Sequence, residues 1–169
     1  TYDIQTDGTW SLYSTLTVPS TATSIKMTKD GQFMVVGMSS HMTIGLVQVY
    51  RRNALFQTGW QQLGFDIFGT DYLGGFGAVV DINNSGTRIV APQVTKTIIK
   101  AGLVGVYDWS GFFWNRTKLF EGTLPNELLG FSVSLDSVGT TLALGSPGHS
   151  VTTINPGSNI TTVNVGKTA

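Results

Sequence analysis

Apolar and polar residues alternate in short runs along most of the chain, the pattern expected of β-strands that have two different faces. In the run 45–50, for example, Leu46 and Gln48 share one face while Val47 and Val49 share the other. No segment sustains the spacing of three to four residues that marks an amphipathic helix. The pattern therefore predicts an all-β chain.

Internal repeats organise these strands. Three segments align on a shared glycine, and each predicts an alternating strand, a tight turn and a second apolar strand: Thr23–Gly37, Phe76–Pro92 and Phe131–Gly145. Their turn glycines, Gly31, Gly86 and Gly139, lie 55 and then 53 residues apart. Glycine suits such turns because it adopts positive φ at little cost.

A third and a fourth strand follow in the first two units. The run 45–50 matches the run 102–107, and Trp60 matches Trp114 at a distance of 54 residues. Four short strands at a period of about 54 residues are typical of folds that give one sheet to each repeat, as propellers do. We therefore expect one repeat domain over 1–169, divided into an N-terminal closing strand (1–22), two repeats (23–74 and 75–129) and a partial repeat (130–169).

The two ends of the chain are out of phase by one strand. Trp10, Leu12 and Leu16 lie on a segment that corresponds to a fourth strand, whereas Val163 and Val165 end a third strand with no tryptophan strand after it. A sheet that lacks a strand exposes an edge that another strand can join. We expect the N-terminal strand to complete the last sheet, either within the chain or in a neighbouring copy, and the second arrangement gives rings or filaments.

The repeated residues resemble the FG-GAP repeat of integrin-alpha-like β-propellers, in a looser variant that covers about residues 23–147. Phe76-Gly77 and Gly130-Phe131 match the "FG" position, and Ala91-Pro92 and Gly145-Ser146-Pro147 match the "GAP" position. The first unit departs from the pattern, with Thr23-Ser24 and Gly37-Met38 at these places. The resemblance implies propeller-like four-stranded antiparallel blades, an extracellular location, and binding or adhesion instead of catalysis.

Some members of that family bind calcium in a loop of the type Asp-x-Asp-x-Asp-Gly. Only Asp81, Asn83 and Ser85 approach this pattern here. They offer a single carboxylate, whereas calcium takes six to eight oxygens and usually several carboxylates. The sequence favours a plain hairpin turn at this place, with calcium as the alternative, and predicts no other cofactor.

Composition narrows the function further. Hydrophobic residues make up 41% of the chain, enough for a core, while only 12% of residues are charged and the formal net charge is zero. A neutral chain without basic runs lacks the electrostatic footprint of a nucleic-acid-binding protein. No apolar run approaches a membrane-spanning length, and there is no cysteine. Low charge with many Thr, Ser and Gly residues favours an extracellular or cell-surface protein.

Candidate catalytic groups are sparse. The two histidines, His41 and His149, fall in loops with no carboxylate beside them in sequence. The acidic pairs Asp66/Asp71 and Glu121/Glu127 flank loops between units, where acidic residues are commonly solvated. No nucleophile, phosphate or dinucleotide motif is present. The chain is therefore predicted not to be an enzyme.

Aromatic residues and sequons supply the remaining candidate sites. Trp60 and Trp114 recur by repeat position, which favours packing between sheets, whereas Trp109, Phe112 and Phe113 crowd a turn and are candidates for contact with a glycan or partner. Three sequons begin at Asn83, Asn115 and Asn159. Glycosylation is expected at Asn115 and Asn159 in preference to Asn83. The favoured function is a self-assembling structural or adhesive protein that forms a homo-oligomer or filament; the alternative is a carbohydrate- or protein-binding module.

Overall fold

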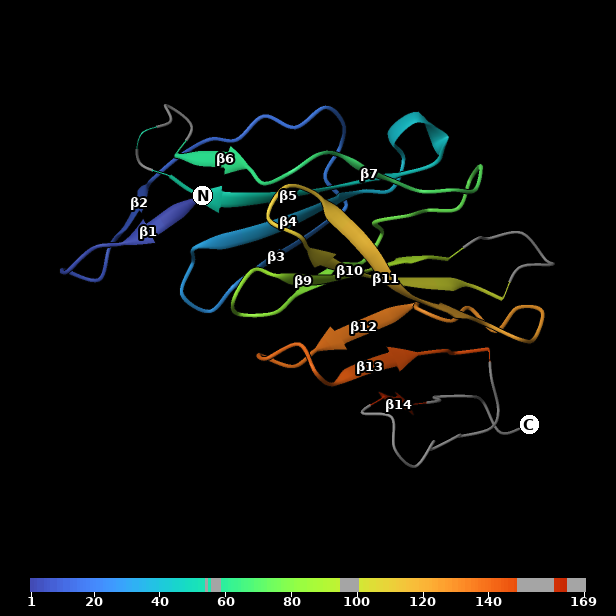
Figure 1. Ribbon diagram of the computed structural model, residues 1–169. Coiled ribbons are helices and arrows are strands. Elements are labelled where there is room, and N and C mark those ends of the chain that lie inside the picture. Colours follow the sequence, from blue (N-terminus) through green and yellow to red (C-terminus); the bar gives the residue numbers. More distant parts are fainter. Residues whose placement is uncertain (54, 56–58, 95–100, 149–159, 164–169) are drawn as a thin grey trace.

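The computed structural model describes residues 1–53, 55, 59–94, 101–148 and 160–163, the last four by their backbone pairing (Figure 1). The described chain is all-β, as the alternation predicts. Its only helical element is a three-residue 3-10 turn, η1 (His41–Thr43). No described segment forms a helix with the length and hydropathy needed to cross a bilayer.

The first repeat folds as a meander of antiparallel strands. Its strands follow one another across the sheet in chain order: β3 (Ser24–Met27), β4 (Phe33–Met38), β5 (Leu46–Arg52) and β6 (Trp60–Gln62). A further short strand, β7 (Ile67–Phe68), also pairs with β5. The tryptophan strand lies at the outer edge, in the position that the repeat predicts.

The second repeat builds the same sheet again. Its strands are β8 (Asp81–Ile82), β9 (Arg88–Gln93), β10 (Leu103–Trp109) and β11 (Trp114–Glu121), all antiparallel and in chain order. The third sheet is shorter and contains β12 (Ser132–Leu135), β13 (Leu142–Gly145) and β14 (Ile160–Val163). There β14 runs parallel to β13, whereas the third strand of each other sheet runs antiparallel to the second.

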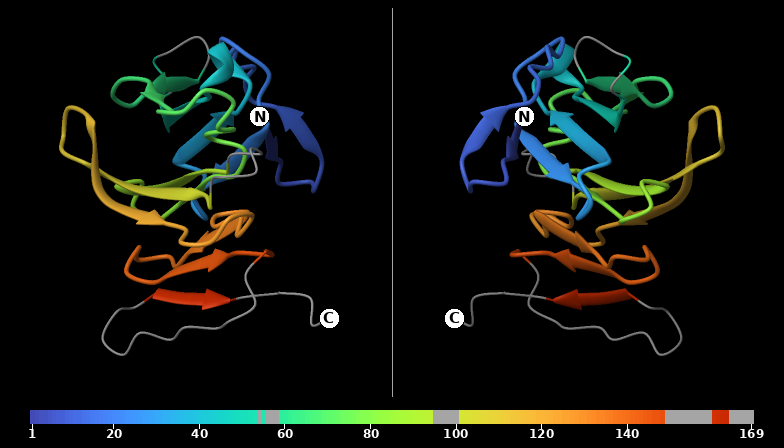
Figure 2. Two further views of the ribbon diagram at one scale, coloured as in Figure 1. Left: turned by 90° about the vertical axis from the view of Figure 1, so that its right-hand side faces the viewer. Right: turned by 90° about the vertical axis from the view of Figure 1, so that its left-hand side faces the viewer.

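The three sheets stack face to face, one above the other (Figure 2). One core, with Val35, Val47 and Val49 among its members, lies between the first and second sheets. Another, with Val90 and Leu144 among its members, lies between the second and third. Strand alternation explains how a sheet serves two neighbours, because successive side chains point to opposite faces.

The first sheet confirms the predicted facing of its third strand. Val47 and Val49 pack in the core shared with the second sheet, while Leu46 and Tyr50 pack in a separate cluster on the other face. That outer cluster is covered in part by Leu16 from the N-terminal segment.

Glycines allow each sheet to approach the next. A Cβ atom on Gly37 would overlap the carbonyl oxygen of Gly77, in the segment that leads into the second sheet. The seam recurs one repeat later, where Gly102 lies against the carbonyl of Leu129 as Gly45 lies against that of Phe76. These approaches fix the distance between successive sheets, since any larger residue would push the backbones apart.

One side chain at the same repeat position caps the first turn of every sheet. Thr28 Oγ1 accepts the amide of Phe33 at 3.0 Å. Asn83 Oδ1 accepts the amide of Arg88 at 3.0 Å, and Asp136 Oδ1 accepts that of Thr141 at 2.7 Å. Short polar side chains commonly close turns in this way, and so three different residues perform one structural task.

A buried carboxylate joins all three sheets at their first strands. Asp81, whose side chain is 4% exposed, lies 3.4 Å from the ammonium of Lys26 in the first sheet. Its other oxygen accepts the backbone amide of Leu135 in the third sheet at 2.8 Å. The second sheet is thereby tied to both neighbours through one residue.

The N-terminal segment does not complete the third sheet within the chain, contrary to one of the two predicted arrangements. Instead β1 (Tyr2–Ile4) and β2 (Trp10–Leu12) pair with each other. This hairpin lies beside the first sheet, at the opposite end of the stack from β14 (Figure 1). An ion pair between Asp3 and Arg52 and the stacking of Arg52 on Tyr13, 3.8 Å from the ring centroid, hold it there. These contacts close a shorter stretch of chain than pairing with the third sheet would, and so have a somewhat smaller entropic cost.

Replacing Gly37 with alanine is expected to destabilise the fold by steric overlap at the seam, by about 2–3 kcal/mol. Gly8→Ala is the matched control, because no atom lies within 4 Å of an added Cβ at Gly8. The only cost there is the strain of alanine in a left-handed backbone, about 1 kcal/mol. Urea unfolding followed by circular dichroism measures both. Equal losses would show that the seam tolerates a side chain.

Asp81→Ala is expected to cost about 1–3 kcal/mol, because the amide of Leu135 loses its acceptor in a partly buried place. Lys26→Met is expected to cost less than about 1 kcal/mol, since the lysine side chain is 52% exposed. Chemical unfolding of both variants separates the two contributions. A larger loss for Lys26→Met would mean that the ion pair, and not the amide contact, joins the sheets.

Candidate functional site

The two ends of the stacked sheets differ in their loops (Figure 1). The tight turns after β3, β8 and β12 lie at one end, while η1 and the segments that follow β7 and β11 lie at the other. This second end, called the loop end below, contains a pocket of about 840 Å³. Its lining comes from loops of the first two repeats and from the start of the third: Ser39, Ser40, Thr43, Leu73, Gly75, Ala78, Val79, Val94, Leu128 and Phe131.

Three residues that line this pocket have left-handed backbones although they are not glycine. Their φ angles are 65° at Thr43, 57° at Leu73 and 56° at Leu128. The loop conformation itself repeats, since Leu73 and Asn126 occupy one equivalent position, and Gly75 and Leu128 occupy another, all at positive φ. The repeat thus imposes left-handed positions, and leucine occupies one of them in each loop.

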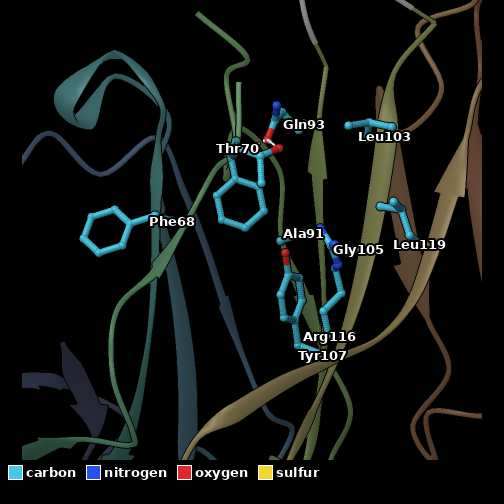
Figure 3. Close-up of a pocket in the computed structure, with 10 residues that line it drawn as sticks. Phe68, Thr70, Ala91, Gln93, Leu103, Gly105, Tyr107, Arg116 and Leu119 are labelled. Atoms are coloured by element: carbon cyan, nitrogen blue, oxygen red, sulfur yellow. Dashed lines mark hydrogen bonds between the residues drawn. The ribbon is translucent and has the colours of Figure 1, made fainter. Parts of the chain in front are cut away.

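A much smaller cavity lies between the first and second sheets (Figure 3). Its volume of about 20 Å³ is enough for roughly one water molecule. Gln93 is buried beside it and accepts the amide of Thr70 at 3.0 Å, while its side-chain nitrogen has no acceptor among the described residues. Burial raises the pKa of Tyr107, and the positive charge of Arg116, followed by a hydrogen bond from it, opposes that rise. The cavity is too small to be a substrate site.

The structure separates the three candidate aromatic residues of the β10–β11 hairpin. Trp109 packs its ring 5.4 Å from that of Trp114 and lies against Gly64, so it belongs largely to the edge of the core. Phe112 and Phe113 are 81% and 47% exposed at the hairpin tip. Trp114 is buried and donates to the carbonyl of Leu63 in the first sheet at 2.9 Å, a contact between sheets.

The candidate calcium loop is occupied by hydrogen bonds within the chain. Besides Lys26 and Leu135, the Asp81 carboxylate accepts the amide of Ile82 at 2.8 Å. The Asn83 amide donates to the hydroxyl of Ser85 at 3.0 Å and, across to the third sheet, to the carbonyl of Val138 at 3.1 Å. The side chains of Asp81, Asn83 and Ser85 therefore have roles in the turn or in joining sheets, and calcium binding stays a prediction.

A third ion pair between strands, Arg88–Asp108, was not predicted from the sequence. Arg88 and Asp108 are register partners on β9 and β10, and the guanidinium binds the carboxylate in two places, at 2.6 and 2.9 Å. This bond is the main cause that lowers the pKa of Asp108, assisted by Thr117. The same guanidinium donates to the carbonyl of Gly139 at 2.6 Å. The hairpin register was the one signal from which this pair could have been inferred.

The outer face of the first sheet holds a polar cluster within its apolar surroundings. Tyr50 donates its hydroxyl to Gln48 at 2.6 Å, and Gln48 donates to Asp66 at 2.7 Å. Burial first, and then the charge of Asp66, raise the pKa of Tyr50 to about 12. The phenol is thus held neutral, as a hydrogen-bond donor and not as a base.

Two of the candidate catalytic groups, His41 and Glu127, make contacts within the described residues. His41 lies 6.2 Å from the ring of Phe68, and His149 lies outside the described residues. Glu127 accepts the amides of Thr123 and Leu124 at 2.6 and 3.0 Å and so closes a loop. No group of three or more metal-ligating side chains occurs among the described residues.

The predicted sequons and assembly residues occupy different environments. Asn115 is exposed on β11, Asn83 is 3% exposed, and Asn159 lies outside the described residues. A glycan on Asn83 would have to displace the turn that its amide forms. On β2, Trp10 and Leu12 are 68% and 60% exposed.

The remaining assembly residues differ as well. Leu16 packs against the first sheet, which leaves it partly buried. Val163 pairs with Gly145 by its backbone. Val165 lies outside the described residues.

Comparison with known proteins gives a likeness of fold. No protein family model and no curated protein sequence matches the chain. A functionally unknown protein from Desulfotomaculum acetoxidans matches over 83% of this chain and 42% of its own, with 18% identity and a TM-score of 0.52. The hydrazine synthase of Kuenenia stuttgartiensis matches over 71% of this chain and 30% of its own, with 20% identity and a TM-score of 0.47. The chain thus spans less than half the length of either structure.

Trp109→Ser is expected to lower the free energy of unfolding by about 2–3 kcal/mol, because it removes a large side chain from the edge of the core. Phe112→Ser is expected to change it by less than about 0.5 kcal/mol. Thermal and chemical unfolding of the two variants provide the measurement. Similar effects would mean that Trp109 is as peripheral as the hairpin tip.

Proposed function

We propose that the chain is a non-enzymatic, extracellular or cell-surface repeat protein of the FG-GAP-like propeller type, and that it assembles by adding the sheets of a second copy to its own stack. Each four-stranded sheet is then one blade. The contact is made between sheet faces, and β14 is the last described strand of the third sheet. Structural or adhesive function follows from such assembly.

The exposure of apolar residues on the first sheet carries this proposal. Ile25 and Met27 are 61% and 38% exposed on its outer face. The residues at the same repeat positions in the second sheet, Val80 and Ile82, are 6% and 4% exposed because the first sheet covers them. The N-terminal segment covers part of this outer face, but the β3 edge of the face keeps the composition of a covered face while it is exposed.

The outward face of the third sheet carries small and polar side chains instead of large apolar ones. Ser132 and Ser134 on β12 are exposed, and Ala143 on β13 is half-buried. Their repeat equivalents include Asp81 and Val90, which are 3% and 0% exposed beneath the third sheet. Stacking this face on the outer face of the first sheet of another copy would continue the series already present inside the chain. Such a contact joins two different surfaces, and so it gives a ring or a filament.

Light scattering after size-exclusion chromatography tests this assembly. The chain is expected to have at least twice the monomer mass at micromolar concentrations, and Ile25→Glu is expected to shift it to the monomer because a charge cannot be buried there without a partner. Tyr72→Glu is the control, since Tyr72 is 70% exposed in a loop and not on a sheet face. A monomer at every concentration, with an unchanged circular dichroism spectrum, would contradict the proposal.

The alternative is a carbohydrate- or protein-binding module, and the hairpin tip favours it. Phe112 is 81% exposed where the β10–β11 hairpin ends, and exposed aromatic rings commonly contact sugars or partner proteins. Binding on a glycan array that Phe112→Ala abolishes would support this function. The variant should fold normally because the side chain has little to lose in packing.

A further inference from the structure

We infer that the pocket at the loop end binds an uncharged, mainly apolar small molecule. Its volume of about 840 Å³ lies within the range of roughly 300–1,000 Å³ that is usual for small-molecule sites. The site is independent of the faces proposed for assembly, since it is built from loops and not from sheet faces.

The lining determines the chemistry of the ligand. Three loops contribute the apolar side chains of the lining, which are Leu73, Val79, Val94, Leu128 and Phe131. In the described part of the lining, the hydroxyl groups come from Ser39, Ser40 and Thr43, which lie close together in the chain before and within η1. The lining thus offers a broad apolar surface with hydrogen-bonding groups on one side, an arrangement that orients a mostly apolar molecule by a single polar end.

Charge argues against an ionic ligand. Among the described residues, none of the lining side chains is Asp, Glu, Lys, Arg or His. The carboxylate of Glu127, next to Leu128 in the chain, is already bound to two backbone amides. A charged ligand would therefore lose its hydration without gaining a counter-charge, which is unfavourable in an apolar environment.

The two leucines at left-handed positions supply an independent observation. Two loop positions recur in both repeats at positive φ. The first is Leu73 in one loop and Asn126 in the next, and the second is Gly75 in one loop and Leu128 in the next. Asparagine and glycine tolerate positive φ, whereas leucine pays a conformational cost there. Leu73 and Leu128 both add an apolar side chain to the same pocket, which asparagine or glycine at those positions would not do. Strain that persists in this way is characteristic of functional sites.

The walls of the pocket are held by backbone hydrogen bonds. The amide of Leu73 donates to the carbonyl of Thr43 at 2.7 Å and so connects two of the loops. The amide of Ala78 donates to Gly75 at 3.0 Å, and that of Phe131 donates to Leu128 at 3.1 Å. The pocket is consequently formed before any ligand arrives, which lowers the entropic cost of binding.

Fluorescence titration with N-phenyl-1-naphthylamine, a neutral apolar probe, tests the site. The wild-type chain is expected to bind it saturably with one site per chain. Leu128→Gly is expected to weaken binding about tenfold without lowering the melting temperature, because glycine accepts the left-handed backbone while removing part of the apolar wall. Leu128→Asp is expected to weaken it further.

Two controls make the result specific to this pocket. Val138→Ser removes an apolar side chain that is 68% exposed at the opposite end of the sheets, and it is expected to leave binding unchanged. The sulfonated analogue 8-anilinonaphthalene-1-sulfonate shares the probe's ring system and is expected to bind at least tenfold more weakly. Absence of saturable binding, equal loss in Val138→Ser, or equal affinity for the sulfonated probe would each overturn the inference. The oligomeric state, measured separately, decides the assembly proposal whatever this titration shows.

Discussion

The close approach of backbone segments between successive sheets is the constraint on which the rest of this structure depends. Gly37 and Gly45 receive the segment that leads into the second sheet, and Gly102 receives the segment that leads into the third. With side chains absent at these points, the apolar faces of neighbouring sheets come into contact and close two cores. Hydrophobic burial supplies the driving force, but the glycines determine where each sheet can lie.

The polar residues of the chain mostly complete this arrangement. Asp81 links three sheets, and Arg88 connects a cross-strand carboxylate with the carbonyl of Gly139 in the third sheet. Thr28, Asn83 and Asp136 close equivalent turns with different functional groups. Residues that resemble candidate ligands or bases in the sequence therefore satisfy backbone groups that the stacking would otherwise leave unpaired. A low content of charged residues is compatible with such a role.

Sequence alone predicts the regular part of this fold and fails where context decides. The period-2 pattern in Leu46–Tyr50 and the recurrence of Trp60 and Trp114 predict strand facing and sheet order correctly. The parallel direction of β14 and the pairing of β2 with β1 were not predictable, because propensity does not specify a partner strand or its direction. The same limit applies to the candidate sites.

Side-chain exposure illustrates that limit most clearly. Trp109 and Phe112 look equivalent in sequence, yet only Trp109 lies near Trp114 and the core edge. The pocket at the loop end escaped sequence analysis because its lining comes from loops far apart in the chain. Its one local signal is leucine at positions where the other repeat has asparagine or glycine, and this signal acquires meaning only once the backbone conformation is known.

The repeated seam also bears on how such a chain changes in evolution. Each seam involves only two adjacent sheets, and Gly45 and Gly102 occupy the same repeat position in it, whereas the equivalent of Gly37 is Pro92. A duplicated unit inserted between two existing ones would therefore meet a similar backbone approach at this glycine on both sides. Repeat proteins whose contacts are restricted to neighbours gain and lose units more readily than globular domains do. The number of units is thus the property of this architecture that selection can alter most freely.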